Sequence, residues 1–320
     1  MSNKITKRIK NSMLVNWTSR ILQGIKPPGF EGMSLYDLTV FLTRSFKEGN
    51  YAIRAAAISF NLILAIFPLL LVILALIPYL PIDGFQTSVL AEIKLFIPEN
   101  MKDLIIPTLE DLILEKHYFV LSIGFILTIY YASNSINTIL RSFNSSFQIE
   151  LTRHPIKQRL IALSLSLVWA ILSLGAIVLM ILGEDLILLM QESLSMNETI
   201  TYYLGHGIKW IVVFFMLILG ITILYNFGNP EMKKFKFVSA GSSLAALVII
   251  LASIGFIAYA TNFGNYNELY GSLGSLIVLL LWINLCSRIL LIGFELTTKI
   301  DQYKKLSLDD DKIPQTPQNA

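Results

Sequence analysis

The segment AAAISFNLILAIFPLLLVILALI, from Ala55 to Ile77, contains no charged residue in 23 positions. An α-helix rises about 1.5 Å per residue, so roughly 20 apolar residues are enough to cross the hydrocarbon core of a bilayer, which is about 30 Å thick. Water does not tolerate an apolar surface of that length, whereas a bilayer requires it. The segment therefore predicts a transmembrane helix.

The rest of the chain repeats this pattern. Hydrophobic residues make up 54% of the 320 residues and charged residues only 15%, against about 25% charged residues in ordinary soluble domains. Six blocks are long enough to span a bilayer: Ala57–Leu80, Tyr118–Leu140, Leu160–Leu182, Ile208–Asn226, Phe237–Ala260 and Ser272–Thr297. We therefore predict an all-α, polytopic integral membrane protein with six transmembrane helices.

The basic residues are distributed unevenly between the connecting segments. Four segments, 1–56, 141–159, 227–236 and 298–320, carry 20 of the 25 Lys and Arg residues, whereas 82–117, 183–207 and 261–271 together carry three. Because basic flanks are retained on the cytoplasmic side, this asymmetry predicts that both termini are cytoplasmic.

The topology divides the chain into three parts. We predict a cytoplasmic N-terminal region (1–56), a six-helix membrane domain (57–297) and a cytoplasmic tail (298–320). The acidic run and the Pro- and Gln-rich end of the tail predict that it is disordered.

Two segments outside the membrane domain have the pattern of amphipathic helices. In the N-terminal region one helical face collects Leu38, Phe41, Leu42 and Phe46. Basic residues close to this stripe, including Arg54, favour an interfacial helix on anionic lipid. In the outer loop the repeat consists of Ile105, Leu109 and Leu112, with Pro98 and Pro107 predicted as breakers. We expect short helices on the outer surface there.

Composition and motifs exclude several function classes. The net charge is only +3 with no visible basic face, so we expect no nucleic-acid partner. The one cysteine, Cys286, excludes an internal disulfide. The three histidines, His117, His154 and His206, fall outside, inside and outside on the predicted topology, so we expect no zinc site. Without a hydrolase or nucleotide motif, the chain is predicted not to be an enzyme and to need no cofactor.

Polar residues inside the predicted spans are the informative ones, because hydrocarbon penalises unpartnered polar groups. On the second and sixth helices, spacings of three, four and seven align such residues on one face, and Glu295 is a natural counter-charge for an arginine. The candidate substrate-binding residues, all in cytoplasmic halves, are Asn61, Asn134, Asn137, Arg141, Asn284, Arg288 and Glu295. They predict a cytoplasm-facing polar cavity with surplus positive charge, suited to an anionic group.

A structural interpretation competes with this one. Asparagines inside helix bundles often serve as interhelical hydrogen-bond partners, and an arginine near a helix end, such as Arg141, can extend to the interface. Pro68 interrupts the first helix and is either a hinge or a kink that fits a neighbour. Small residues four apart, such as Gly241 and Ala245, favour close helix packing.

Three blocks of the sequence resemble a known family. They are Ala55–Ile77, quoted above, SNSINTILRSFNSSF at Ser133–Phe147, and YGSLGSLIVLLLWINLCSRILLIGFEL at Tyr270–Leu296. Together they resemble the YihY/virulence factor BrkB family, which implies a multi-pass protein of the bacterial inner membrane with six helices. The matching motif positions are Phe67, Pro68, Asn137, Arg141, Gly271, Gly274, Trp282 and Glu295, whereas Arg288 stands where relatives are expected to carry a small or apolar residue.

The resemblance also brings an old family label, ribonuclease BN, which these residues do not support, because phosphodiester hydrolysis needs metal ligands or an acid and base in a wet site. The function predicted here is transporter-like or lipid-translocating, with membrane lipids as partners. The alternatives are a scaffold that organises envelope proteins through its outer loops and, third, a membrane ribonuclease.

Overall fold

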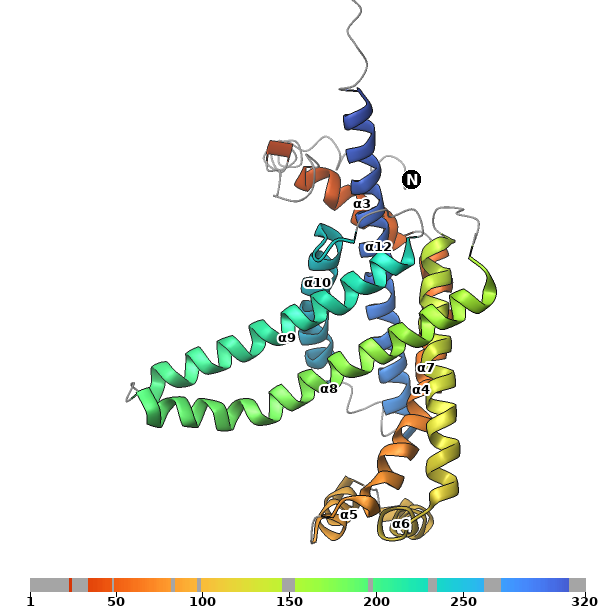
Figure 1. Cartoon of the computed structure of the whole chain (residues 1–320), viewed down its shortest axis with the longest axis vertical. Helices are drawn as coiled ribbons and strands as arrows, with labels where there is room; N and C mark the ends of the chain where they lie inside the picture. Colours follow the sequence, from red (N-terminus) through yellow and green to blue (C-terminus); the bar gives the residue numbers. More distant parts are fainter. Residues whose placement is uncertain are drawn as a thin grey trace, which may run out of the picture. The chain divides into compact units, whose positions relative to one another are not determined.

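The computed structural model describes residues 23–24, 34–47, 49–81, 84–96, 99–145, 153–194, 198–229, 235–261 and 272–310. In these residues the regular secondary structure is helical throughout (Figure 1). Six helices are long and apolar enough to cross a membrane, over Tyr51–Tyr79, Tyr118–Asn144, Pro155–Leu179, Gly207–Gly228, Ala240–Tyr259 and Leu276–Gln302. The prediction of an all-α polytopic membrane protein with six spans is confirmed.

The helices that contain the spans extend beyond the apolar blocks. They are α4 (Gly49–Leu76, continued by η1, Ile77–Tyr79), α7 (Tyr118–Asn144), α8 (Pro155–Leu194), α9 (Glu198–Gly228), α10 (Ala240–Thr261) and α12 (Ser272–Asp310). Hydropathy marks only the part of a helix that lies in hydrocarbon, whereas backbone hydrogen bonds continue the helix into polar sequence. The predicted ranges are therefore shorter than most of the observed helices.

The chain divides into two compact units, which we describe separately. The α4–α7 unit consists of Ala57–Ile139 and Thr152–Leu167. The α9–α12 unit consists of Met1–Ala56, Leu140–Leu151 and Val168–Ala320. The helices α4, α7 and α8 each contribute to both units.

In the α4–α7 unit, the predicted outer loop folds into α5 (Phe85–Phe96) and α6 (Glu99–Leu114). Ile77, Leu90 and Ile113 form its buried apolar cluster, and Lys94 Nζ lies 2.6 Å from Glu110 Oε1. These contacts confirm that the loop is helical.

Pro107 does not break α6, contrary to the prediction, but lies inside it. A proline removes the N–H that would bond to the carbonyl four residues earlier. Here that carbonyl belongs to the exposed Asp103, where water can satisfy it. The other predicted breaker, Pro98, lies outside the described residues.

Pro68 likewise lies inside a continuous α4. A close contact with α7 accompanies it: an added Cβ at Gly124 would lie 3.0 Å from the side chains of Leu71 and Val72 and 3.9 Å from the Pro68 carbonyl oxygen. Glycine thus lets the two helices approach each other next to the proline.

In the α9–α12 unit, α12 packs on α10 and α9. Gly241 and Ala245 of α10 face Gly293 of α12, where any larger side chain would collide with the opposite helix. The predicted small-residue contact at Gly241 and Ala245 is therefore confirmed. Nearby, Phe143 stacks on Phe294 with ring centroids 4.1 Å apart.

The predicted amphipathic helix is α3 (Leu35–Lys47), which Ser34 caps by accepting a hydrogen bond from the Asp37 N–H at 3.2 Å. Leu38 is buried against Leu296 and Ile300 of α12, and Phe41 packs beside them. Part of the stripe expected to face lipid therefore packs on protein, because α12 extends beyond its span and offers an apolar face.

This extension also corrects the prediction for the tail. Residues 298–310 continue α12 as a helix rather than being disordered. Two contacts explain the difference: Ile300 is buried against α3, and Asp301 forms an ion pair with Lys236. Residues 311–320 lie outside the described residues.

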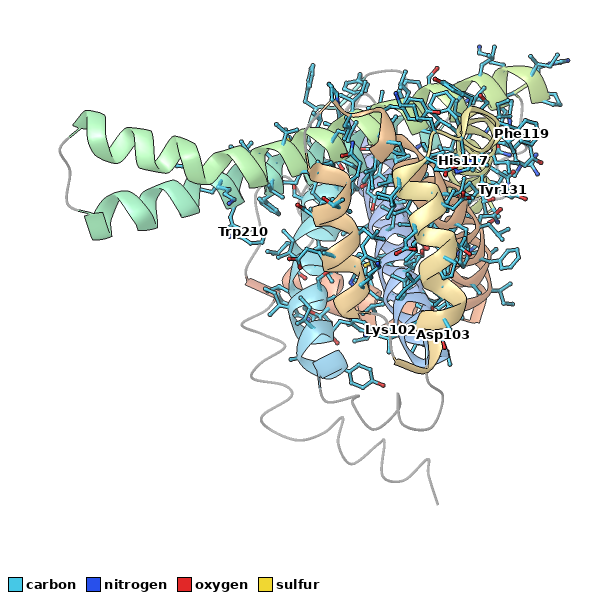
Figure 2. All side chains as sticks on the ribbon, turned by 90° about the horizontal axis from the view of Figure 1, so that it is seen from below. Lys102, Asp103, His117, Phe119, Tyr131 and Trp210 are labelled. Atoms are coloured by element: carbon cyan, nitrogen blue, oxygen red, sulfur yellow. The ribbon has the colours of Figure 1, made fainter. Side chains whose placement is uncertain are left out.

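Exposed aromatic side chains mark the predicted outer ends of two spans. Tyr118 and Phe119, at the start of α7, are 68% and 77% exposed, and Trp210 of α9 is 58% exposed. Figure 2 labels Phe119 and Trp210 on these helices, together with His117 before α7 and Lys102 on α6. Aromatic rings of this kind are typical of the membrane–water interface.

Candidate functional site

The seven predicted site residues are divided between the two units. Asn61, Asn134 and Asn137 belong to the α4–α7 unit, and Arg141, Asn284, Arg288 and Glu295 belong to the α9–α12 unit. Each group is described within its own unit.

Asn61 and Asn134 join α4 to α7. Asn134 Nδ2 donates to Asn61 Oδ1 at 2.6 Å, and Ser135 Oγ donates to the Asn61 carbonyl oxygen at 2.8 Å. Asn61 Nδ2 in turn donates to the Ala57 carbonyl oxygen at 2.9 Å. These two asparagines therefore act as interhelical hydrogen-bond partners, as the structural interpretation expects. Such hydrogen bonds contribute about 0.6 kcal/mol on average to the stability of membrane proteins.

Asn137 accepts a hydrogen bond from Gln158 Nε2 of α8 at 3.4 Å. Gln158 is buried, and among the described residues its Oε1 atom has no hydrogen-bond partner. The next residue, Arg159, lies over the ring of Tyr130 with its guanidinium carbon 5.0 Å from the ring centroid. These contacts extend the polar seam of α7 along α8.

In α12 the predicted pair between Arg288 and Glu295 is wrong. Arg288 Nε donates to Asn284 Oδ1 at 3.0 Å, and Glu295 Oε1 forms an ion pair with Lys299 Nζ at 3.0 Å. Each side chain takes a partner four residues away, because residues one turn apart on a helix are closer than residues seven apart. Arg141, the fourth predicted residue of this unit, is exposed.

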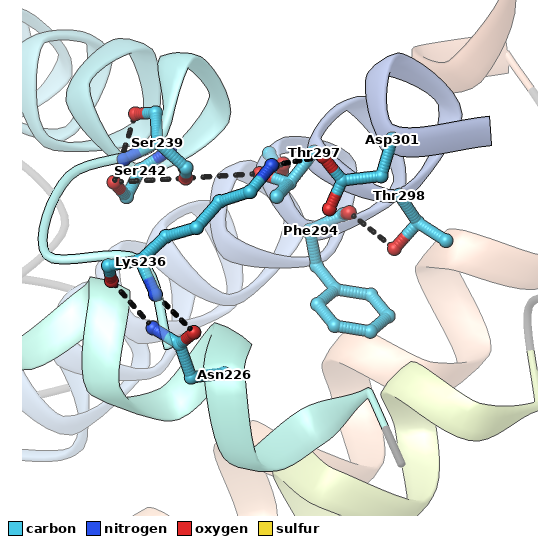
Figure 3. Close-up of polar contacts among 9 residues, drawn as sticks. Asn226, Lys236, Ser239, Ser242, Phe294, Thr297, Thr298 and Asp301 are labelled. Carbon is cyan, nitrogen blue, oxygen red and sulfur yellow. Dashed lines mark hydrogen bonds and ion pairs between the residues drawn. The ribbon is translucent and has the colours of Figure 1, made fainter. Parts of the chain in front are cut away.

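A polar network surrounds the first turn of α10 (Figure 3). The Asn226 amide bonds to both backbone groups of Lys236, at 2.8 Å and 2.9 Å, while Lys236 Nζ pairs with Asp301 of α12. Ser242 Oγ accepts from Thr222 Oγ1 at 2.8 Å and contacts the capping Ser239. The network ties α9 and the start of α10 to α12.

Sequence reasoning missed Lys236 and Asp301 as partners. Lys236 counted only as a basic flank, and Asp301 was assigned to a disordered tail. Lys236 and Asp301 are 65 positions apart, so their contact produces no hydrophobic periodicity in the sequence. The sequence after Thr297 is nevertheless compatible with a continued helix, and that signal could have indicated where Asp301 lies.

One histidine lies beside two carboxylates, a local group that the prediction of no zinc site did not consider. Ligand atoms of His117, Asp111 and Glu115 all lie within 4.8 Å of one another, so this group is able to hold a metal ion. His117 Nε2 lies 2.9 Å from the Asp111 carbonyl oxygen. The three residues are neighbours in sequence at the end of α6 and in the turn that follows it.

Two arginines lie at helix ends outside this set. Arg54 Nη1 donates to the Ser142 carbonyl oxygen at 2.8 Å and so satisfies a carbonyl in the last turn of α7. Burial lowers the pKa of Arg153, just before α8, from its usual range. Arginine remains charged under such shifts, so positive charge persists at both positions.

Comparison with known proteins identifies relatives over nearly the whole chain. A family model described as virulence factor BrkB matches residues 42–318. The ribonuclease-like protein YfkH of Bacillus subtilis is 27% identical over 83% of this chain and 95% of its own length. A UPF0761 membrane protein of Haemophilus influenzae is 25% identical over 84% of this chain and 97% of its own. No solved structure matches the chain.

Proposed function

The chain belongs to the virulence factor BrkB family, and from this premise we propose that it is a transporter-like protein of the bacterial inner membrane that translocates an anionic lipid. In this proposal, polar residues in the cytoplasmic halves of the spans receive the charged headgroup. Transport requires neither a cofactor nor catalysis by the chain.

The charge balance inside the spans carries the proposal. The six candidate spans contain seven basic residues, namely Arg54, Arg141, Lys157, Arg159, Lys209, Arg288 and Lys299, and two acidic residues, Glu295 and Asp301. Both carboxylates pair with lysines, Glu295 with Lys299 and Asp301 with Lys236. Neither neutralises Arg288, whose contact with Asn284 is a neutral one. An unneutralised guanidinium such as that of Arg288 is costly in hydrocarbon, and an anionic headgroup would offset that cost.

The test is headgroup movement in liposomes. Purified protein is reconstituted with fluorescent phosphatidylglycerol, and a membrane-impermeant quencher measures transfer between leaflets. Replacing Arg288 by Gln and Arg141 by Gln is expected to reduce transfer by about tenfold, equivalent to about 1.4 kcal/mol. The exposed Lys116→Gln, outside the spans, serves as the control for general loss of charge. The proposal is contradicted if the unmodified protein gives no more lipid transfer than protein-free liposomes. It is also contradicted if neither arginine variant changes the transfer.

A scaffold function is the second candidate, because the outer loop is a folded structure with its own apolar cluster and ion pair. It predicts that substitutions of the seven predicted site residues are tolerated, whereas substitutions on the exposed face of α6, such as Asp103→Lys, abolish co-purification of envelope proteins.

A ribonuclease function is suggested only by the name of the Bacillus subtilis relative. The group Asp111, Glu115 and His117 is able to hold a metal ion but belongs to the segment predicted to lie outside the cell, away from cytoplasmic RNA. Cleavage of tRNA by purified protein, lost in Asp111→Asn, would support this function over transport.

A further inference from the structure

Arg159 brings a positive charge to the middle of α7. It is the fifth residue of α8, and its Nη2 atom lies 3.4 Å from the carbonyl oxygen of Tyr130. Tyr130 is the thirteenth of the 27 residues of α7, so it lies about 20 Å from either end of the helix. The guanidinium therefore lies beside the middle of α7.

The contacts of Arg159 with α7 leave most of its hydrogen-bonding capacity unused. A guanidinium has five N–H donors, and the contact with Tyr130 is long and uses one of them. The Tyr130 carbonyl oxygen already accepts from Ser133 Oγ at 2.9 Å. Among the residues that the structure describes, Arg159 has no carboxylate partner. A ligand with negatively charged oxygens matches the remaining donors.

Gln158 gives a second and independent indication of a ligand. Its side chain is 5% exposed, and its Nε2 atom donates to Asn137 Oδ1, which fixes the orientation of the amide. The opposite atom, Oε1, is buried and has no partner within the described part of the chain. A buried carbonyl without a donor is unfavourable, so this position calls for a hydrogen-bond donor such as a hydroxyl group.

The two side chains contact the same face of α7. Tyr130 and Asn137 are seven residues apart, which is close to two helical turns, or about 10 Å along the axis. Ile156 and Leu160, on the same part of α8, are exposed and apolar. A ligand at this seam thus meets an anion-binding group, a hydroxyl-binding group and a surface suited to acyl chains.

We propose that Arg159 and Gln158 bind the headgroup of an anionic glycerophospholipid that carries a free hydroxyl, as in phosphatidylglycerol. The phosphate oxygens accept hydrogen bonds from Arg159, the headgroup hydroxyl donates to Gln158 Oε1, and Asn137 positions Gln158. A zwitterionic lipid fits less well, because its ammonium group adds positive charge beside Arg159. This inference rests on the proposed function and names the lipid class that the protein would handle.

Native mass spectrometry of the full chain in detergent tests the site. The probes are phosphatidylglycerol, phosphatidylethanolamine, phosphatidic acid and soluble glycerol 3-phosphate. Phosphatidylglycerol is expected to be retained about tenfold more strongly than phosphatidylethanolamine, which corresponds to about 1.4 kcal/mol. Equal retention of these two lipids overturns the proposal. If glycerol 3-phosphate binds as strongly as phosphatidylglycerol, the site recognises a soluble phosphate, and the proposal that its ligand is a lipid is overturned.

Variants assign the two contacts. Arg159→Gln is expected to lose about tenfold in phosphatidylglycerol binding, whereas Arg159→Lys retains part of it because the charge remains. Gln158→Leu is expected to weaken phosphatidylglycerol about threefold but to leave phosphatidic acid, which has no headgroup hydroxyl, unchanged. The neighbouring, exposed Lys157→Gln is the matched control. Unchanged binding in folded Arg159→Gln, judged by its thermal unfolding midpoint, refutes the site.

The same variants separate this inference from the proposed function. Phosphatidylglycerol that binds through Arg159 but is not moved between leaflets supports the site and contradicts transport. Movement that is insensitive to both Arg159→Gln and Gln158→Leu supports transport and contradicts the site.

Discussion

At the scale of single residues, polar side chains in this protein find partners close by. Asn61 meets Asn134 across a helix interface, Glu295 meets Lys299 one turn away, and Tyr225 donates from its hydroxyl to the Leu290 carbonyl oxygen at 2.8 Å. A polar group in hydrocarbon is unfavourable until it is hydrogen-bonded or paired, so each of these side chains takes a partner that lies next to it in the folded structure. Buried polar atoms that have no partner among the described residues, such as Gln158 Oε1, are therefore the informative exceptions.

The bond between Asn61 and Asn134 is measurable by a double-mutant cycle. Asn61→Ala, Asn134→Ala and the double variant are compared by thermal unfolding in detergent. Their coupling free energy is expected to be about 0.6 kcal/mol and at most about 1.7 kcal/mol, the range of interhelical hydrogen bonds in membranes. A coupling near zero would mean that the 2.6 Å contact between the two amides does not form in the folded protein.

Two glycines test the close packing of α10 on α12. In Gly293→Ala the new Cβ collides with the Tyr225 hydroxyl and lies 2.8 Å from Ala245 Cβ, so we expect a loss of about 1–3 kcal/mol in the free energy of unfolding. Gly255→Ala, on α10, has no atom within 4 Å of the new Cβ and is the matched control. Alanine favours helix over glycine, so the control is expected to be neutral or slightly stabilising. Equal unfolding midpoints for the two variants would contradict the packing.

At the scale of elements, one ion pair links the segment just before α10 to the C-terminal part of α12. The Asp301 carboxylate is 16% exposed and Lys236 38% exposed. Because Lys236 is partly solvated, Asp301→Asn is expected to cost about 1 kcal/mol or less in unfolding free energy. The swapped pair, Lys236→Asp with Asp301→Lys, should recover at least part of that loss. Glu115→Gln, at an exposed acid, is the control, and a swap that is worse than either single variant would argue against a direct pair.

The elements also show what the sequence predicts and where it stops. Six apolar blocks predicted six spans, because hydrocarbon imposes one requirement on length and composition. The predicted stripe of α12 correctly placed Asn284, Arg288 and Glu295 on one helix but assigned the wrong partner to each charge. Periodicity determines which face a residue shares, whereas partners depend on rotamers and on the neighbouring helices.

Pro107 and residues 298–310 are two places where local composition did not predict the observed helix. Local composition predicted a break and a disordered tail, yet both segments are helical. Packing against another element overrides weak local preferences, as Ile300 shows by its burial against α3. The contacts of Arg159 and Gln158 were missed for a related reason, because both were counted as part of a cytoplasmic flank.

At the scale of the whole molecule, the described residues contain an even number of candidate spans, six, which predicts that the two ends of the chain lie on the same side of the membrane. The distribution of Lys and Arg predicts that this side is the cytoplasm. The helices α5 and α6 would then lie outside, and the first turn of α8 would lie inside. This orientation decides whether the polar halves of the spans open to the cytoplasm, so every proposal about an entering headgroup depends on it.

Cysteine labelling measures this orientation directly. In a Cys286→Ser background, Thr108→Cys on α6 and Lys157→Cys on α8 each provide one thiol at an exposed position. A membrane-impermeant maleimide is expected to label position 108 in intact cells and position 157 only after permeabilisation, because basic flanks stay in the cytoplasm during insertion. The reverse pattern would invert the topology and place the polar halves outside. Labelling of both positions in intact cells would be incompatible with the assigned spans, because α7 is the one candidate span between positions 108 and 157 in the described part of the chain.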